Sequence, residues 1–279
     1  MPLWLVVASV LLSAENCECR GCATDRRSAT TGSDASTSFA VTSADRRFSA
    51  DQVARIAEVQ RTHLYWHWRG EKQPPAWIPK CQIVVHATRA SYAAAIGRGG
   101  EATFGSSLID NRDGVCRARR VDLLADRLGE LSALPHELTH VTISEMLGGR
   151  TPPRWLDEGI ALLADSADKQ ERHAKDLAAA TARRLHFRAS DLMQLGGYPP
   201  PSRIPAFYAQ SGSLVAFLAR RREPAKLLAF AERAHARGYD AALREIYELD
   251  GIPALEAAWL ADQPQSLAYA QARSRAISD

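Results

Sequence analysis

Apolar residues recur at helical spacing along most of this 279-residue chain, and the first such stretch begins near Ser49. Ser49 and Gln52 have the spacing of a capping box, in which the first polar side chain satisfies a backbone N–H at the start of a helix. Apolar side chains then follow at the intervals of one helix face, at Val53, Ile56, Val59 and Leu64. The pattern predicts that ordered structure begins here with a helix.

Residues 76–126 carry short apolar and β-branched runs in place of a helical repeat. The clearest run is Ile83-Val84-Val85, and residues 102–104 and 121–124 are further strand candidates. A short helix is expected at residues 92–96 between them. This part of the chain is therefore predicted to form a sheet.

Two helices separated by a reversal are predicted between residues 132 and 165. Residues 132–135, Ser-Ala-Leu-Pro, supply an N-cap and a first-turn proline, so that a helix starts just before His136. The glycines at 148–149 end it, and the prolines at 152–153 force a break. A second helix is expected from about Trp155 to Asp165.

The chain after residue 155 is mainly helical by the same criterion. Residues 196–201 are predicted to form a loop because they are Gly-Gly-Tyr-Pro-Pro-Pro. This loop is expected to lie near the cleft. Alanine-rich stretches with leucine at helical spacing occur at 174–185, 205–222, 224–237, 239–249 and 253–261. The prediction is an α+β fold, in which a small N-terminal mixed sheet precedes a mainly helical half and a site lies between the two.

Composition is that of a globular protein, with 46% hydrophobic and 24% charged residues. The net charge of +3 and the absence of a basic stripe interleaved with aromatic residues argue against a nucleic-acid partner. A single catalytic domain is expected at residues 49–262. Residues 24–48, which are rich in Ser, Thr, Asp and Arg, are expected to be a flexible linker, and 263–279 a C-terminal tail.

The N-terminus has the character of an export signal. Residues 2–14 are apolar, carry no charged side chain and are too short to span a bilayer. Cleavage after Ala23, with Gly21 three residues from the cut, fits the small-residue rule better than cleavage after Ala14. Residues 1–23 are therefore predicted to be a leader of a periplasmic or extracellular protein, with no stable membrane span once it is removed.

Cysteine placement bears on the same compartment. Cys17, Cys19 and Cys22 have no fourth metal partner in the sequence, and cleavage after Ala23 would remove them and leave Cys81 and Cys116. In an oxidising compartment these two would form a disulfide. Two buried free thiols are the alternative.

The first of the two helices predicted between residues 132 and 165 contains His136-Glu137-Leu138-Thr139-His140, an H-E-x-x-H motif. Positions i and i+4 share one helix face, so both imidazoles can reach a single ion. Catalytic zinc takes three protein ligands and leaves a fourth position to water. Glu158 is a third ligand of suitable chemistry, and Glu137 is the candidate base. Asp157 precedes Glu158 and points about 100° away from it on a helix, so only one of these two carboxylates can face the metal.

These residues resemble a known group. HELTH followed by Trp155-Leu156-Asp157-Glu158-Gly159-Ile160-Ala161 is similar to gluzincin metallopeptidases, closest to the bacterial peptidase-MA-like families related to aminopeptidase-N-type enzymes. The resemblance implies a zincin-like fold with one zinc ion on His136, His140 and Glu158, and Glu137 as general base. Some gluzincins place an aspartate where this chain has Leu162; Asp165 or a backbone carbonyl is then expected to orient a histidine.

The segment 207–214, Phe-Tyr-Ala-Gln-Ser-Gly-Ser-Leu, resembles a further helix of peptidase-MA-like chains, in which a tyrosine stabilises the oxyanion. Tyr208 matches that tyrosine; the alternative is that Tyr208 and Phe207 are core aromatic residues. The resemblance also implies that an edge strand pairs with extended substrate, and residues 117–124 are expected to supply it.

Two functions remain in consideration. The first is an exported zinc-dependent metallopeptidase acting on peptide or protein substrates. The second is a catalytically inactive zincin-like binding or scaffold protein, which the presence of Glu137 disfavours because a structural zinc site needs no base. A metzincin is excluded, since Ile143 and Met146 stand where that class has glycine and a third histidine. The chain lacks a segment that would recognise a free N-terminal amine, which favours endopeptidase action.

Overall fold

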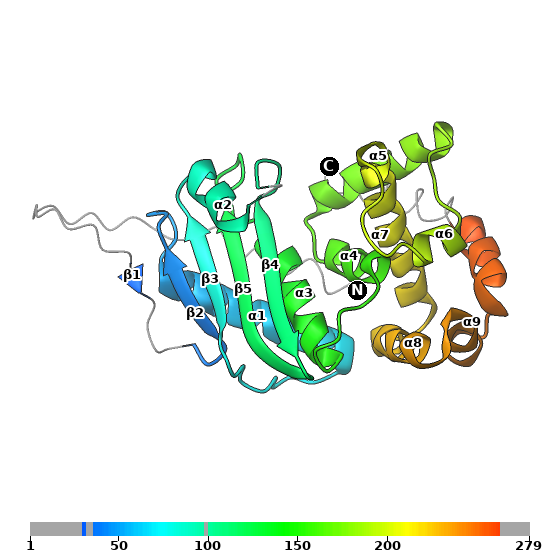
Figure 1. Ribbon diagram of the computed structural model, residues 1–279, viewed down its shortest axis with the longest axis horizontal. Coiled ribbons are helices and arrows are strands. Elements are labelled where there is room, and N and C mark those ends of the chain that lie inside the picture. The colour runs from blue at the N-terminus through cyan, green and yellow to red at the C-terminus, as the bar shows by residue number, and fades with distance from the viewer. Residues whose placement is uncertain (1–29, 32–35, 98–99, 263–279) are drawn as a thin grey trace, which may run out of the picture.

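The computed structural model describes residues 30–31, 36–97 and 100–262. The expected leader at 1–23 with its three cysteines, and the expected tail at 263–279, lie outside the described residues. Within them a mixed sheet with two covering helices is followed by a mainly helical half (Figure 1). The predicted α+β class is confirmed.

The sheet has five strands in the order β1-β2-β3-β5-β4. Strands β2, β3 and β5 run parallel, whereas β4 is antiparallel to β5 and β1 to β2. Strand β1 covers only two residues, so the sheet is built mainly from the other four strands. Their bounds are β1 (Thr30–Thr31), β2 (Phe39–Ser43), β3 (Cys81–His86), β4 (Gly105–Arg112) and β5 (Val115–Leu124).

Three sequence-based expectations for this half need correction. Residues 39–43, expected within a flexible linker, form β2, because they pair with β3 and bury Phe39 and Val41. Residues 102–104, a strand candidate, precede β4 instead of forming it. Residues 117–124, expected at the sheet edge, belong to β5, which lies between β3 and β4. The edge strand beside the site is therefore β4.

Two long helices cover one face of this sheet, α1 (Ala50–Arg69) and α3 (Leu134–Met146). The predicted cap of α1 is confirmed, since the Ser49 side chain accepts a hydrogen bond from the Gln52 N–H at 3.2 Å. The short helix α2 (Arg89–Ile96) packs against β3 and β5. Beneath the two long helices the sheet residues are fully buried; they are Ile83, Val85, Val121 and Leu123.

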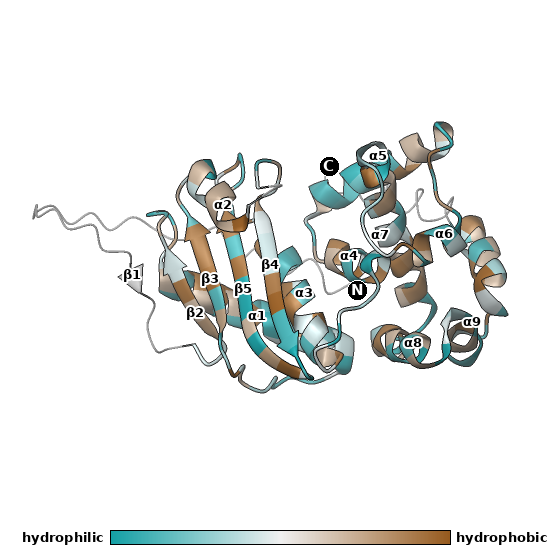
Figure 2. Cartoon of the chain, in the orientation of Figure 1, coloured by the Kyte–Doolittle hydropathy of each residue, from teal (hydrophilic) through white to brown (hydrophobic). Residues whose placement is uncertain are grey.

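The second half consists of helices packed around α7, and its interior is apolar (Figure 2). The helix expected at 224–237 is confirmed at both ends, and the one expected at 174–185 begins earlier, at Ala167. None of the helices in the described part combines the length and apolar character that crossing a membrane requires. The elements are α4 (Arg154–Leu163), α5 (Ala167–Ala182), α6 (Ala189–Met193), a 3-10 turn (Pro201–Arg203), α7 (Ile204–Arg221), α8 (Pro224–Arg237), α9 (Tyr239–Ala242), a π-helical turn (Leu243–Tyr247) and a helix over residues 251–262.

Both cysteines of the described domain are free thiols. Cys81 is fully buried at the start of β3, and burial raises the pKa of its thiol to about 12. Cys116 is only partly buried on β5, three residues before Arg119, which is the register partner of Cys81. Cys81 and Cys116 are therefore free thiols and not a disulfide. The alternative of two buried free thiols holds except that only Cys81 is buried.

Helix α4 lies against α7 at a distance that leaves no room for a side chain on Gly159. A Cβ added there would stand 2.6 Å from the backbone oxygen of Ser211 and 2.4 Å from the Val215 side chain. Both distances are shorter than any ordinary van der Waals contact, and the first involves backbone that cannot rotate away. Glycine at this position is therefore what allows the two helices to meet.

We expect Gly159→Ala to destabilise the protein, although alanine is the better helix former by about 1 kcal/mol. Overpacking a close helix contact costs about 1–3 kcal/mol, and the backbone contact favours the upper part of that range. Thermal unfolding followed by circular dichroism should show a midpoint lowered by about 2–4 °C per kcal/mol.

Gly196→Ala is the matched comparison, because a Cβ there meets nothing within 4 Å. Its midpoint should stay within about 2 °C of the wild type, since surface substitutions cost less than about 0.5 kcal/mol. Equal stability of the two variants would show that α4 and α7 are not packed as described.

Candidate metal centre

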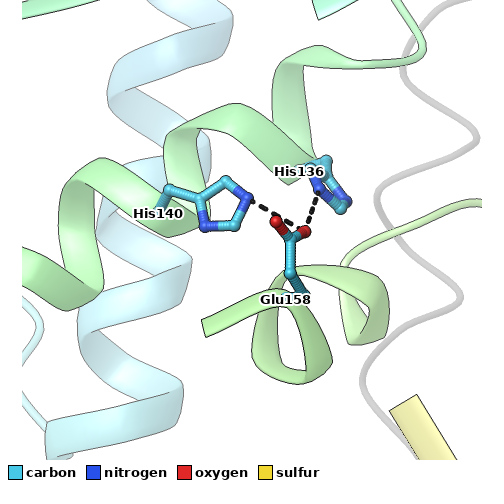
Figure 3. A group of neighbouring side chains, drawn as sticks. All are labelled: His136, His140 and Glu158. Atoms are coloured by element: carbon cyan, nitrogen blue, oxygen red, sulfur yellow. Dashed lines mark ion pairs between the residues drawn. The ribbon is translucent and has the colours of Figure 1, made fainter. Parts of the chain in front are cut away.

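Two imidazoles and one carboxylate converge at the junction of the two halves of the fold (Figure 3). His136 and His140 lie one turn apart on α3, and Glu158 projects toward them from α4. The Glu158 Oε2 atom is 3.6 Å from His136 Nε2 and 3.7 Å from His140 Nε2. One ligand atom from each residue lies within 4.8 Å of the others, so the group could hold a metal ion.

The reversal between α3 and α4 is what brings Glu158 back across the histidines. Helix α3 ends at Met146, and Gly148 and Gly149 follow with φ angles of +67° and +81°, a region that glycine adopts without strain. Helix α4 then begins at Arg154 after a proline. The predicted order of helix, reversal and helix is confirmed, although α3 has Ala133 in place of Ser132 at its N-cap position and no side-chain cap.

The donor set fits a divalent cation by size as well as by chemistry. Ligand atoms 2.0–2.2 Å from a tetrahedral metal stand about 3.4 Å from one another. The two nitrogen–oxygen separations are within a few tenths of an ångström of that value. The side chains are also nearly enclosed, with 16%, 10% and 5% of His136, His140 and Glu158 exposed. An enclosed donor set of this kind could hold a metal ion.

Each imidazole has a second carboxylate on its far side. Asp165, which follows α4, has Oδ2 3.5 Å from His136 Nδ1 and is also contacted by Lys169 at 3.2 Å. This agrees with the expectation that Asp165 orients a histidine. Asp157 has Oδ1 2.9 Å from His140 Nδ1, close enough for a hydrogen bond but not aligned for one.

The role of Asp157 is one that sequence reasoning missed. From the sequence alone, its position about 100° around the helix from Glu158 indicates only that it does not face the metal. Because of this offset, the Asp157 carboxylate lies against His140 Nδ1, the ring nitrogen that faces away from the candidate metal position. Carboxylates beside the second nitrogen of a ligating histidine commonly orient its ring, and Asp157 occupies that place without making an aligned hydrogen bond.

Charge balance in the metal-free group favours protonated imidazoles. Burial lowers the pKa of His136, but hydrogen bonding to Asp165 and Glu158 outweighs it and raises the pKa to about 10. The pKa of His140 is raised as well, because Asp157 outweighs burial. Burial opposes ionisation of Glu158, yet His136, His140 and Tyr198 lower its pKa. The carboxylates around the two imidazoles therefore favour positive charge at this point of the structure.

Glu137, the predicted base, lies on α3 against the start of β4. A Cβ on Gly105 would stand 2.8 Å from its Oε1 atom, so glycine leaves the space that this carboxylate fills. Its side chain is 8% exposed, and no group in the described ranges forms a hydrogen bond or ion pair with it. Glu137 is thus adjacent to a candidate ligand and is not committed to a structural partner.

Tyr208, the predicted oxyanion donor, reaches the site through a second tyrosine. Its hydroxyl is 3.4 Å from the Tyr198 hydroxyl, which in turn donates to Glu158 Oε1 at 2.6 Å. Phe207 is fully buried, whereas Tyr208 is half-buried at the edge of the core, so the core-aromatic interpretation fits Phe207 better. Burial raises the pKa of both tyrosines, to about 12 for Tyr198, so both remain protonated donors at neutral pH.

Sequence reasoning placed the loop at 196–201 near the cleft but gave Tyr198 no function. No motif distinguishes it, and its contact with Glu158 depends on how that loop folds back. No protein-family model matches the chain, and a search of curated proteins finds no significant match. Function must therefore be inferred from the geometry of this site.

We expect His140→Ala to abolish stoichiometric metal binding, because it removes one of three ligands. Zinc content after dialysis should fall from about one ion per chain to near zero, measured by inductively coupled plasma mass spectrometry. His63→Ala serves as the comparison, since His63 is exposed on α1, and its metal content should not change. Unchanged zinc in His140→Ala would refute the ligand assignment.

Metal affinity should rise with pH. Binding must displace a proton from His136, whose pKa is raised to about 10, whereas Glu158 is already ionised at neutral pH. Below that pKa each displaced proton strengthens binding about tenfold per pH unit. Competition against a chelator of known protonation behaviour at pH 6, 7 and 8 measures this slope, and a flat profile would contradict the protonated metal-free state.

Proposed function

We propose that the protein is a zinc-dependent metallopeptidase of the gluzincin type, acting on peptide bonds. The observation that carries the proposal is the approach of Glu158 Oε2 to 3.6 and 3.7 Å from two histidines eighteen or more residues away in the chain. Imidazole and carboxylate ligands suit zinc, and three of them leave a coordination position open. The likeness of HELTH and WLDEGIA to gluzincin motifs supports the same assignment.

When bound by these residues, zinc would lower the pKa of a water molecule to about 7 and polarise the substrate carbonyl. Glu137 accepts the proton of the attacking water and later gives it to the leaving amine. Its position beside His136, without a structural partner among the described residues, suits this role. A structural zinc site would have no need of such a carboxylate.

The developing oxyanion requires a donor besides the metal, and we assign it to Tyr208. Its hydroxyl is joined to the site through Tyr198, and burial keeps it protonated. A positioned donor of this kind is commonly worth about 3 kcal/mol in the transition state.

Substrate is proposed to bind as an extended strand along β4. That strand is the edge of the sheet, it packs beside α3, and its first residue, Gly105, adjoins Glu137. A peptide added at this edge would gain backbone hydrogen bonds, which supply affinity without demanding a particular sequence. The apolar leader at 1–23 leads us to propose that the enzyme works outside the cytoplasm.

We expect Glu137→Gln to retain zinc and lose turnover, because glutamine has the size of glutamate but cannot accept the proton. The rate of peptide cleavage should fall by about 10²–10⁴-fold. Zinc content and the cleavage profile of a peptide library, measured on the same preparation, test both parts.

Glu171→Gln is the matched substitution, since Glu171 is a surface residue whose carboxylate pairs with Lys175. It should leave both zinc and turnover unchanged. If Glu137→Gln cleaves every substrate at the wild-type rate, the hydrolytic mechanism is wrong. Zinc binding without turnover in the wild type would favour the inactive binding or scaffold protein.

A further inference from the structure

The segment between α6 and the 3-10 turn touches the metal centre through one side chain. Residues 194–200 connect Met193 to Pro201 and have no regular secondary structure. Gly196 and Gly197 are exposed, and a Cβ on either would meet nothing within 4 Å. Tyr198 follows them and is 50% exposed, yet its hydroxyl reaches Glu158, which is 3% exposed.

Tyr198 and the histidines contact different oxygens of the same carboxylate. The Tyr198 hydroxyl donates to Oε1 at 2.6 Å, whereas Oε2 faces both imidazoles. A carboxylate held by one oxygen presents the other in a fixed direction. Hydrogen bonds of this kind to ligating groups orient them, and their loss commonly weakens metal affinity about 10–100-fold.

The tyrosine ring is itself held in place by α4 and α7. The guanidinium carbon of Arg154 lies 4.7 Å from the ring centroid, and Phe207 meets the ring edge-on at 5.9 Å. These contacts hold the tyrosine ring beside Glu158, in a segment whose Leu195 and Pro199 pack inward while Gly196 and Gly197 are exposed. The position of the segment and the orientation of the carboxylate are therefore set by the same side chain.

We propose that Tyr198 is a positioning residue for Glu158, and that docking of residues 194–200 and metal binding strengthen one another. The proposal rests on the proposed function only in that the three-residue group binds a metal. Linkage of this kind is reciprocal. If docking of the segment raises the affinity for the metal, then bound metal must stabilise the docked segment by the same free energy.

The first experiment compares zinc affinity of the wild type with Tyr198→Phe and Tyr208→Phe. Both variants lose one hydroxyl and keep the ring, but Tyr208 is bonded to Tyr198 and not to Glu158. Competition with a chelator at fixed pH should show zinc binding weakened about 10–100-fold in Tyr198→Phe. Tyr208→Phe should stay within about twofold of the wild type.

The second experiment tests reciprocity without reference to activity. Hydrogen exchange of the backbone amides at 194–198 is measured by mass spectrometry with and without saturating zinc. Zinc should slow exchange in the wild type and have little effect in Tyr198→Phe, where the link is broken. A role confined to general stability would not produce a zinc effect that depends on this hydroxyl.

The outcomes separate this inference from the proposed function. Wild-type affinity in a folded Tyr198→Phe variant, or zinc protection of 194–198 that survives the substitution, overturns the inference and leaves the metallopeptidase proposal standing. The measurement of turnover in Glu137→Gln tests the metallopeptidase proposal independently. A wild type that binds no zinc contradicts both.

Discussion

Close packing of α4 between α3 and α7 is the constraint on which the candidate site depends. Glu158 and Gly159 are adjacent, so the residue that faces the histidines is followed by the one that touches the backbone of Ser211. A side chain at 159 would push α4 away from α7 and displace Glu158 with it. The same short helix therefore carries the carboxylate and the contact that fixes its position.

Burial of the two imidazoles together with Glu158, Asp157 and Asp165 is tolerated because each of these five groups lies beside one of opposite sign when the imidazoles are protonated. His136 lies between Glu158 and Asp165, and His140 between Glu158 and Asp157. Burying an unpaired charge costs several kcal/mol, which these pairs offset. The same carboxylates that raise the pKa of the imidazoles would balance the charge of a bound divalent cation.

The two halves of the fold contribute different parts of the proposed chemistry. The sheet half supplies α3 with both histidines and Glu137, together with the open edge of β4. The helical half supplies Glu158, the two aspartates beside the outer nitrogens of the histidines, and the two tyrosines. A site built across such a junction depends on both cores, and its tyrosines come from a segment and a helix far along the chain from the motif.

The sequence alone determined the α+β class, the helices on either side of the 148–149 reversal and the three candidate ligands, because helical periodicity, glycine and proline act over a few residues. Only tertiary structure decided that Asp157 lies against His140, that Tyr198 contacts Glu158, and that β4 is the edge strand. Strand β2 could not be predicted from the sequence either, since it forms by pairing with β3, which lies about forty residues further along the chain. Such contacts depend on how distant segments pack, and no local pattern encodes them.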